Sequence, residues 1–124
     1  MRIYVSHSSS FDFQSQLYQP LSESALAGEH VLIFPHRQSN EPFPIRELLA
    51  KRQCDLVVAE VSYPSTGQGI ELAWAAQYGV PILCVSRIDT KRSSSLEALK
   101  PTFIEYRDGR NLIEIVKDFI EHSS

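Results

Sequence analysis

The sequence predicts one α/β domain over residues 1–124, a Rossmann-like or flavodoxin-like three-layer fold around a parallel sheet of roughly five strands. A chain of 124 residues with 43% hydrophobic content suits a single core. Strand-like apolar runs alternate with helical patterns along the whole chain, as in parallel sheets joined by crossover helices. No internal repeat or linker-like stretch divides the sequence.

The first half of the chain predicts two strands and two helical segments. A strand is expected at residues 3–5 and another at residues 30–34. Apolar residues at helical spacing mark residues 11–27, where Pro20 predicts a kink or two short helices because it lacks an amide hydrogen. A short helix is expected at residues 45–49.

The second half begins with residues 55–61, a continuous apolar run typical of a strand in the middle of a parallel sheet. In the helix that follows, Ile70, Trp74 and Tyr78 stand at i, i+4 and i+8, which predicts that they face the core. The remaining expected elements are strands at residues 80–86 and 102–106, a short helix near residues 96–100 and an amphipathic helix at residues 111–122.

Charge and composition exclude several classes of protein. The net charge is −3 and the basic residues are scattered, so we expect no nucleic-acid-binding face. No apolar run approaches the ~18 residues of a membrane span, and the N-terminus has no signal-peptide core, which predicts a cytoplasmic protein without membrane contact. Cys54 and Cys84 are expected to be reduced core thiols. The histidines are dispersed, so we predict neither a metal nor another cofactor.

The stretch "SYPSTGQGIEL" (residues 62–72) has two glycines and a carboxylate where a predicted strand turns into a helix. A Walker loop needs a lysine after Gly69, and a dinucleotide loop needs glycine where Leu72 stands, so both interpretations fail. One alternative is purely structural. Ser65 then caps the helix, the glycines allow the turn, and Glu71 is a solvated residue in an early turn.

The other alternative is a ligand site. Gly69 lowers helix stability by about 1 kcal/mol relative to alanine, and a ligand close to the backbone would explain its presence. Glu71 would face that ligand, ionised as a nucleophile requires. Such sites lie beyond the carboxyl ends of parallel strands, where residues 6–10 and 87–95 are also expected.

Residues 55–75, "DLVVAEVSYPSTGQGIELAWA", resemble the signature of the nucleoside 2-deoxyribosyltransferase superfamily, and most of all its branch of 2′-deoxynucleoside 5′-phosphate N-hydrolases. The resemblance implies that Glu71 is the nucleophile that attacks C1′ of the deoxyribose. It also implies that Tyr4, on the first strand, belongs to the catalytic group.

The same resemblance implies how the substrate is bound. Ser8 and Ser65 would contact its 5′-phosphate, and Gly67 and Gly69 would let the sugar approach. Ser95 would reach the phosphate of a neighbouring subunit, which implies a homodimer with shared active sites.

Three positions depart from the family pattern. Glu47 stands where the family has an aspartate that orients the sugar and assists the leaving base, although it could instead pair with Lys51 at i+4. His7 replaces a glycine. Ser10 replaces a phosphate-binding arginine, which weakens the predicted phosphate site unless His7 or Arg37 compensates. An unphosphorylated nucleoside is therefore an alternative substrate.

Three functions stay open. The first is hydrolysis of the N-glycosidic bond of 2′-deoxynucleoside 5′-monophosphates to base and deoxyribose 5-phosphate, through a glycosyl ester as in a retaining glycosidase. The second is base exchange between deoxynucleosides by a transferase. The third is a non-catalytic nucleotide-binding module. The base is expected to face residues 36–43, whose sequence does not identify it.

Overall fold

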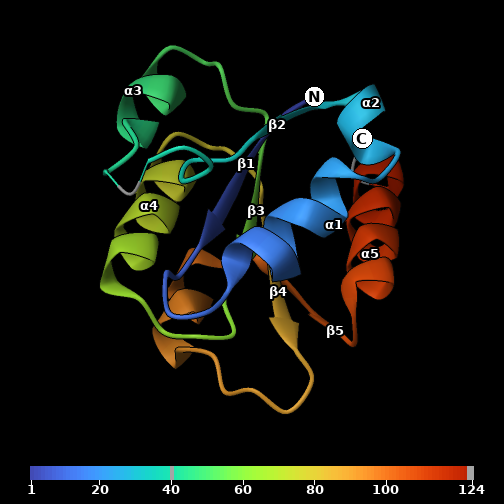
Figure 1. Cartoon of the computed structure of the whole chain (residues 1–124). Helices are drawn as coiled ribbons and strands as arrows, with labels where there is room; N and C mark the ends of the chain where they lie inside the picture. The colour runs from blue at the N-terminus through green and yellow to red at the C-terminus, as the bar shows by residue number, and fades with distance from the viewer. Residues whose placement is uncertain (40, 123–124) are drawn as a thin grey trace.

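The computed structural model describes residues 1–39 and 41–122 and contains a five-stranded, all-parallel sheet (Figure 1). Its strands are β1 (Arg2–His7), β2 (Val31–Ile33), β3 (Leu56–Glu60), β4 (Ile82–Arg87) and β5 (Thr102–Tyr106). Their spatial order is β2-β1-β3-β4-β5, so the direction of winding reverses between β1 and β3. This is the flavodoxin-like order, and it confirms the predicted three-layer Rossmann-like fold.

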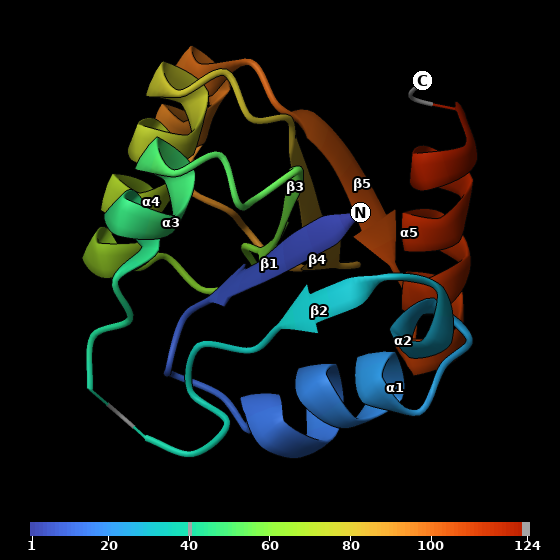
Figure 2. The same ribbon diagram turned by 90° about the horizontal axis from the view of Figure 1, so that it is seen from above.

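Helices cover both faces of the sheet (Figure 2). One face carries α3 (Ile45–Ala50), α4 (Thr66–Gln77) and the 3₁₀ helix η2 (Ser94–Leu99). The other carries the π-helical segment η1 (Gln14–Tyr18), α1 (Gln19–Ser22), α2 (Leu26–Glu29) and α5 (Gly109–His122).

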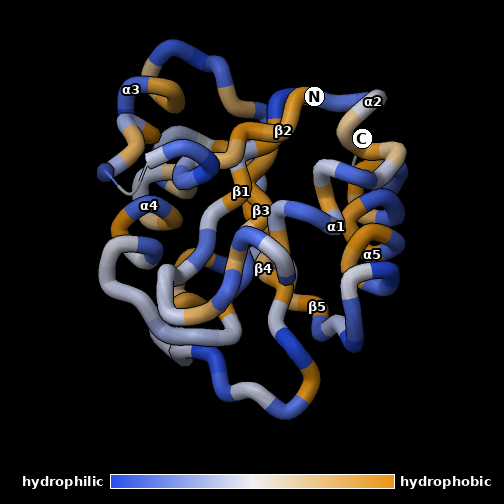
Figure 3. Tube along the Cα trace, viewed as in Figure 1, coloured by the Kyte–Doolittle hydropathy of each residue, from blue (hydrophilic) through white to orange (hydrophobic). Residues whose placement is uncertain are grey.

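The two cores follow from the alternation of side chains along each strand. In β1, Ile3 and Val5 join the core under α1 and α5, while Tyr4 joins the core under α3 and α4. The strands are accordingly the most hydrophobic part of the trace (Figure 3). Cys54 and Cys84 are buried as free thiols in the α3–α4 core. Over the described residues, no helix combines the length and the apolar character needed to cross a bilayer.

Pro20 shapes the segment between the first two strands. The segment forms η1, continues directly into α1 with Pro20 in its first turn, and breaks before α2. A proline ring clashes with the carbonyl four residues earlier, and a wider π turn just before it relieves that clash. The segment is therefore divided into short helices as predicted, but the break lies at residues 23–25 and not at Pro20 itself. Leu17 and Leu21 of the predicted stripe are buried.

The prediction for the buried face of α4 was wrong at Ile70, which is 48% exposed. The helix instead buries Gln68, Leu72 and Ala75, while Trp74 and Tyr78 are half-buried at the edge of the core. Most of α4 is apolar around its whole circumference, so hydrophobic spacing alone does not select one face. Which face of α4 is buried depends instead on where the helix begins after β3.

This orientation of α4 predicts unequal losses of stability for two neighbouring substitutions. Leu72→Ala removes a fully buried side chain and is expected to lower the free energy of unfolding by about 2–5 kcal/mol. Ile70→Ala should change it by no more than about 0.5 kcal/mol. Urea unfolding followed by circular dichroism measures both. Equal losses would contradict the orientation.

Candidate functional site

A pocket of about 430 Å³ opens at the carboxyl ends of β1, β2 and β3, and we call it the Glu71 pocket. It lies where the winding of the sheet reverses, which is the usual place for a ligand in this class of fold. Its polar lining is His7, Ser9, His36, Ser65, Gln68 and Glu71, and its apolar lining includes Phe43, Ile45, Ile70 and Trp74.

Two hydroxyl groups from β1 hold the carboxylate of Glu71. The Tyr4 hydroxyl donates to Oε2 at 2.6 Å and the Ser6 hydroxyl donates to Oε1 at 3.1 Å. Positions 4 and 6 point to the same face of the strand, so one strand supplies both donors. The resulting arrangement presents an oriented carboxyl group to the pocket.

The electrostatics of Glu71 combine opposing effects. Burial raises the pKa of its carboxyl group, while the hydrogen bonds from Tyr4 and Ser6 and the nearby charge of His36 act in the opposite direction. Burial and the neighbouring carboxylate also raise the pKa of Tyr4, so its hydroxyl stays protonated and remains a donor. On balance the pKa of Glu71 is raised, and the hydrogen bonds from Tyr4 and Ser6 limit that rise by stabilising the ionised form.

Ser65 begins α4 as its N-cap, as predicted. Its hydroxyl accepts from the Gln68 amide at 3.4 Å. The Gln68 side chain, however, donates to the Glu60 carbonyl at 2.9 Å and lies buried between β3 and α4, so the structure shows a simple cap instead of a reciprocal capping box. Ser65 and Gly67 both line the Glu71 pocket, which brings the unpaired amides of the first helical turn to its edge.

The backbone does not require glycine at positions 67 and 69. Neither has a positive φ angle, and a Cβ at either position would meet no atom within 4 Å. The turn before α4 therefore does not explain the two glycines, although the purely structural interpretation assigned them to that turn. Gly67 lines the Glu71 pocket and Gly69 lines a second pocket, so both leave space where a ligand would lie.

The second pocket, of about 300 Å³, adjoins the first, and we call it the serine pocket. Its hydroxyl-bearing residues are Tyr63, Ser65, Thr66, Ser93 and Ser95. Ser95 thus lies near Ser65 in the same chain and outside the Glu71 pocket. Ser8 is buried beside the first pocket, where its hydroxyl donates to Ser10 Oγ and accepts from the Ser10 amide, both at 3.0 Å.

Glu47 does not line the Glu71 pocket. It is exposed on α3 and forms an ion pair with Lys51 at 3.4 Å, the alternative that its spacing allowed. Ile45 faces the pocket from the first turn of α3, and a residue two positions later points to the opposite side of a helix. The structure therefore does not bring Glu47 together with Tyr4 and Glu71.

Sequence reasoning placed Ser6 and His36 only within the segments 6–10 and 36–43 expected near the ligand, without giving either residue a role, and it assigned Trp74 to the core. The shared face of positions 4 and 6 could have indicated Ser6, and the position of His36 just after β2 could have indicated a residue at the ligand edge. In the two described ranges, no three His, Cys, Asp or Glu side chains are grouped so that they could hold a metal ion.

By its sheet and the position of its pocket, the chain is a Rossmann-like α/β protein, and solved structures agree. The CMP N-glycosidase of Clostridium botulinum superimposes with a TM-score of 0.67 at 16% identity, over 94% of this chain and 99% of that one. At this identity the match supports the fold alone.

Sequence comparison identifies the family, although no family model matches the chain. The 5-hydroxymethyl-dUMP N-hydrolase of Branchiostoma floridae is 34% identical over 92 residues, which are 73% of this chain and 81% of that protein. The 2′-deoxynucleoside 5′-phosphate N-hydrolase 1 named in Methanosarcina mazei is 37% identical over 78 residues, 60% of this chain. The chain belongs to the family of deoxynucleotide N-hydrolases. It spans 48% of the Methanosarcina protein, about half of its length.

The hydrogen bonds to Glu71 predict how its carboxyl group titrates. Tyr4→Phe removes a donor that stabilises the ionised form, so the pKa of Glu71 should rise further. The carbon-13 resonance of the Glu71 carboxyl group, followed against pH by NMR, measures this directly. Tyr106→Phe is the matched control, since Tyr106 is buried and donates to Glu60 instead. An equal effect of both variants would contradict the assignment.

Proposed function

We propose that this chain hydrolyses the N-glycosidic bond of 2′-deoxynucleoside 5′-monophosphates to free base and deoxyribose 5-phosphate. The observation that carries the proposal is the carboxylate of Glu71, oriented by Tyr4 and Ser6 at the edge of a pocket. The names of the relatives, all of them nucleotide N-hydrolases, support the same bond as the target.

In the first step, a Glu71 oxygen attacks C1′ and forms a glycosyl ester. The bond between C1′ and the base nitrogen breaks, and its electron pair leaves with the base. Tyr4 and Ser6 hold the carboxylate in one orientation throughout. A 2′-deoxy sugar suits this step, because no electron-withdrawing 2′-hydroxyl opposes positive charge at C1′.

The departing base needs a proton, and we assign its delivery to His36. This half-buried side chain lines the same pocket as Glu71. Its Nδ1 lies 3.3 Å from the Ser39 carbonyl oxygen, which leaves Nε2 to face the substrate. As an imidazolium it protonates the base. As a neutral ring it then takes a proton from the water that attacks C1′ and releases Glu71.

The 5′-phosphate is assigned to the start of α4. Ser65 offers a hydroxyl, and the amides of the first helical turn favour an anion. His7 does not compensate for the missing arginine, because both of its ring nitrogens are within hydrogen-bond distance of Ser8 and Tyr18. We also propose a homodimer in which Ser95 of one subunit reaches the phosphate held by the other. Light scattering of the purified protein tests that assembly.

A substrate panel tests the reaction. The protein is incubated with deoxynucleosides and their 5′-monophosphates, with and without an acceptor base, and base release is followed by chromatography. We expect release from monophosphates without an acceptor. New nucleoside only in the presence of an acceptor would instead establish a transferase, and nucleotide binding without turnover would establish a binding module.

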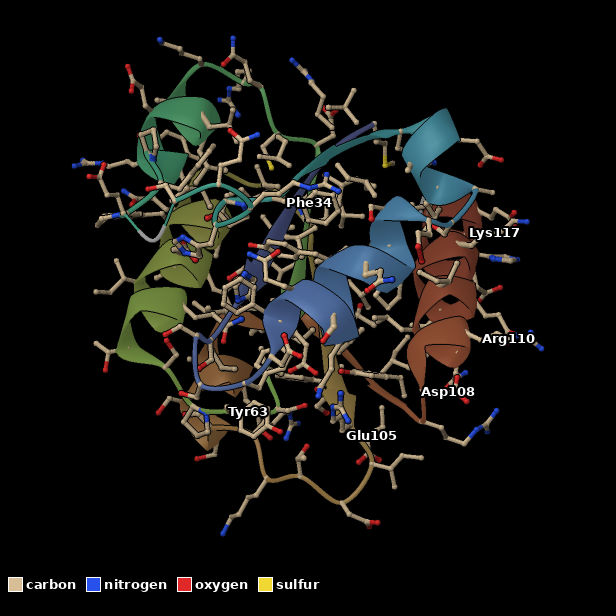
Figure 4. The ribbon with its side chains drawn as sticks, viewed as in Figure 1. Phe34, Tyr63, Glu105, Asp108, Arg110 and Lys117 are labelled. Atoms are coloured by element: carbon tan, nitrogen blue, oxygen red, sulfur yellow. The ribbon has the colours of Figure 1, made fainter. Side chains whose placement is uncertain are left out.

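Glu71→Gln is expected to lower turnover by about three orders of magnitude or more, because an amide cannot form the glycosyl ester. The melting temperature should stay equal or rise, since the variant no longer buries a charge. Glu105→Gln is the control, because Glu105 is exposed on β5 and distant from the pocket (Figure 4). Retained turnover in the Glu71 variant would refute its role as nucleophile.

Gly67→Ala separates binding from folding. The helix should become slightly more stable, by up to about 1 kcal/mol, while the added methyl group occupies the Glu71 pocket and weakens nucleotide binding by about tenfold. Calorimetric titration and thermal unfolding measure the two effects. Gly28→Ala, at an equally open position in α2, should leave nucleotide binding unchanged. Unaltered binding in the Gly67 variant would place the ligand elsewhere.

A further inference from the structure

A line of hydrogen bonds beside the Glu71 pocket joins the ends of β1 and β2. It runs through His7, 7% exposed at the end of β1, and Tyr18, 2% exposed at the end of η1. His7 Nδ1 lies 2.8 Å from the Ser8 carbonyl oxygen, and His7 Nε2 lies 2.6 Å from the Tyr18 hydroxyl. The backbone amide of His36 donates to the same hydroxyl at 3.0 Å.

The partners determine where each proton lies. A carbonyl oxygen only accepts, so His7 Nδ1 carries the ring hydrogen. Burial lowers the pKa of His7, which keeps the ring neutral and leaves Nε2 as an acceptor. Burial also raises the pKa of Tyr18 to about 12. The Tyr18 hydroxyl therefore donates to His7 while its oxygen accepts from His36, and every donor in the line meets an acceptor.

Aromatic packing keeps this line in place. The His7 ring lies 4.3 Å from the ring of Phe13, and the Tyr18 ring lies 4.7 Å from the ring of Phe34, between centroids. Phe34 comes just after β2, next to the helical segment that carries Tyr18 (Figure 4). The His36 backbone is thus tied to β1 through rings that are themselves packed.

We propose that His7 and Tyr18 are positioning residues that hold His36 where it protonates the departing base. This inference rests on the proposed function, in which His36 is the proton donor. Leaving a buried donor or acceptor unpaired costs about 1–3 kcal/mol, so movement of the His36 backbone away from Tyr18 is opposed.

Tyr18→Phe tests the proposal, because it keeps the packed ring and removes only the hydroxyl. We expect hydrogen exchange of the His36 amide, measured by NMR, to become at least about tenfold faster. Base release should slow by about tenfold, with KM within about twofold of the original value. His7→Leu should have the same effects. His7→Gln should restore much of the rate, because its amide offers Tyr18 an acceptor and the Ser8 carbonyl a donor.

The dependence of the rate on the acidity of the leaving base distinguishes a positioning role from a general loss of rigidity in the protein, because a loss of rigidity alone would not change that dependence. Deoxynucleotides with one base scaffold, substituted to give bases of graded acidity, are compared in each variant. If Tyr18 acts by positioning a proton donor, the rate in Tyr18→Phe should depend much more steeply on base acidity, and the most acidic base should leave almost as fast as from the original protein.

Equal slowing for every base, or unchanged exchange of the His36 amide, would overturn the proposal. Faster exchange with unaltered base release would overturn it as well, because His36 would then need no positioning. If the original protein releases no base from any nucleotide, the proposed function fails, and this inference fails with it. If the original protein releases base but Tyr18→Phe leaves the exchange of the His36 amide unchanged, only the positioning role is refuted and the proposed function stands.

Discussion

The hydrogen bonds from Tyr4 and Ser6 to the carboxylate of Glu71 are the interaction around which this protein is organised. They join the inner strand β1 to helix α4 across the point where the winding of the sheet reverses. A carboxylate at this depth needs donors to stay ionised. The strand supplies them from two residues on one face, and the remaining pocket residues surround the group that they hold.

A second buried carboxylate at the same edge of the sheet shows what is particular to Glu71. Glu60 is 1% exposed, and it accepts hydrogen bonds from the Ser62 amide and hydroxyl and from the Tyr106 hydroxyl. Its partners all belong to the protein interior, and it does not line the Glu71 pocket. Glu60 therefore stabilises the connection between β3 and α4, whereas Glu71 keeps an open side toward a ligand.

Strands β3 and β4 could be predicted because each contains a continuous apolar run, which is typical of strands in a parallel sheet covered on both faces. The buried face of α4 could not be predicted, because apolar residues occur on every side of the helix and Ile70 and Leu72 have the same hydrophobic character. Glu71 and Tyr4 were recognised through the motif that contains Glu71 and through the position of Tyr4 on the first strand. Ser6 and His36 carry no motif, and their membership of the site depends on which strand ends become neighbours.

The sequence by itself determined the order of strands and helices, the start of α4 at Ser65, and the glycine-flanked carboxylate after β3, because these depend on local patterns of apolar and polar residues. Only the tertiary structure decided that His36 enters the Glu71 pocket and that Glu47 stays outside it, paired with Lys51. The physical reason is that both outcomes depend on how the connection from β2 to α3 packs against β1 and α4. That packing is set by contacts between residues distant in the sequence.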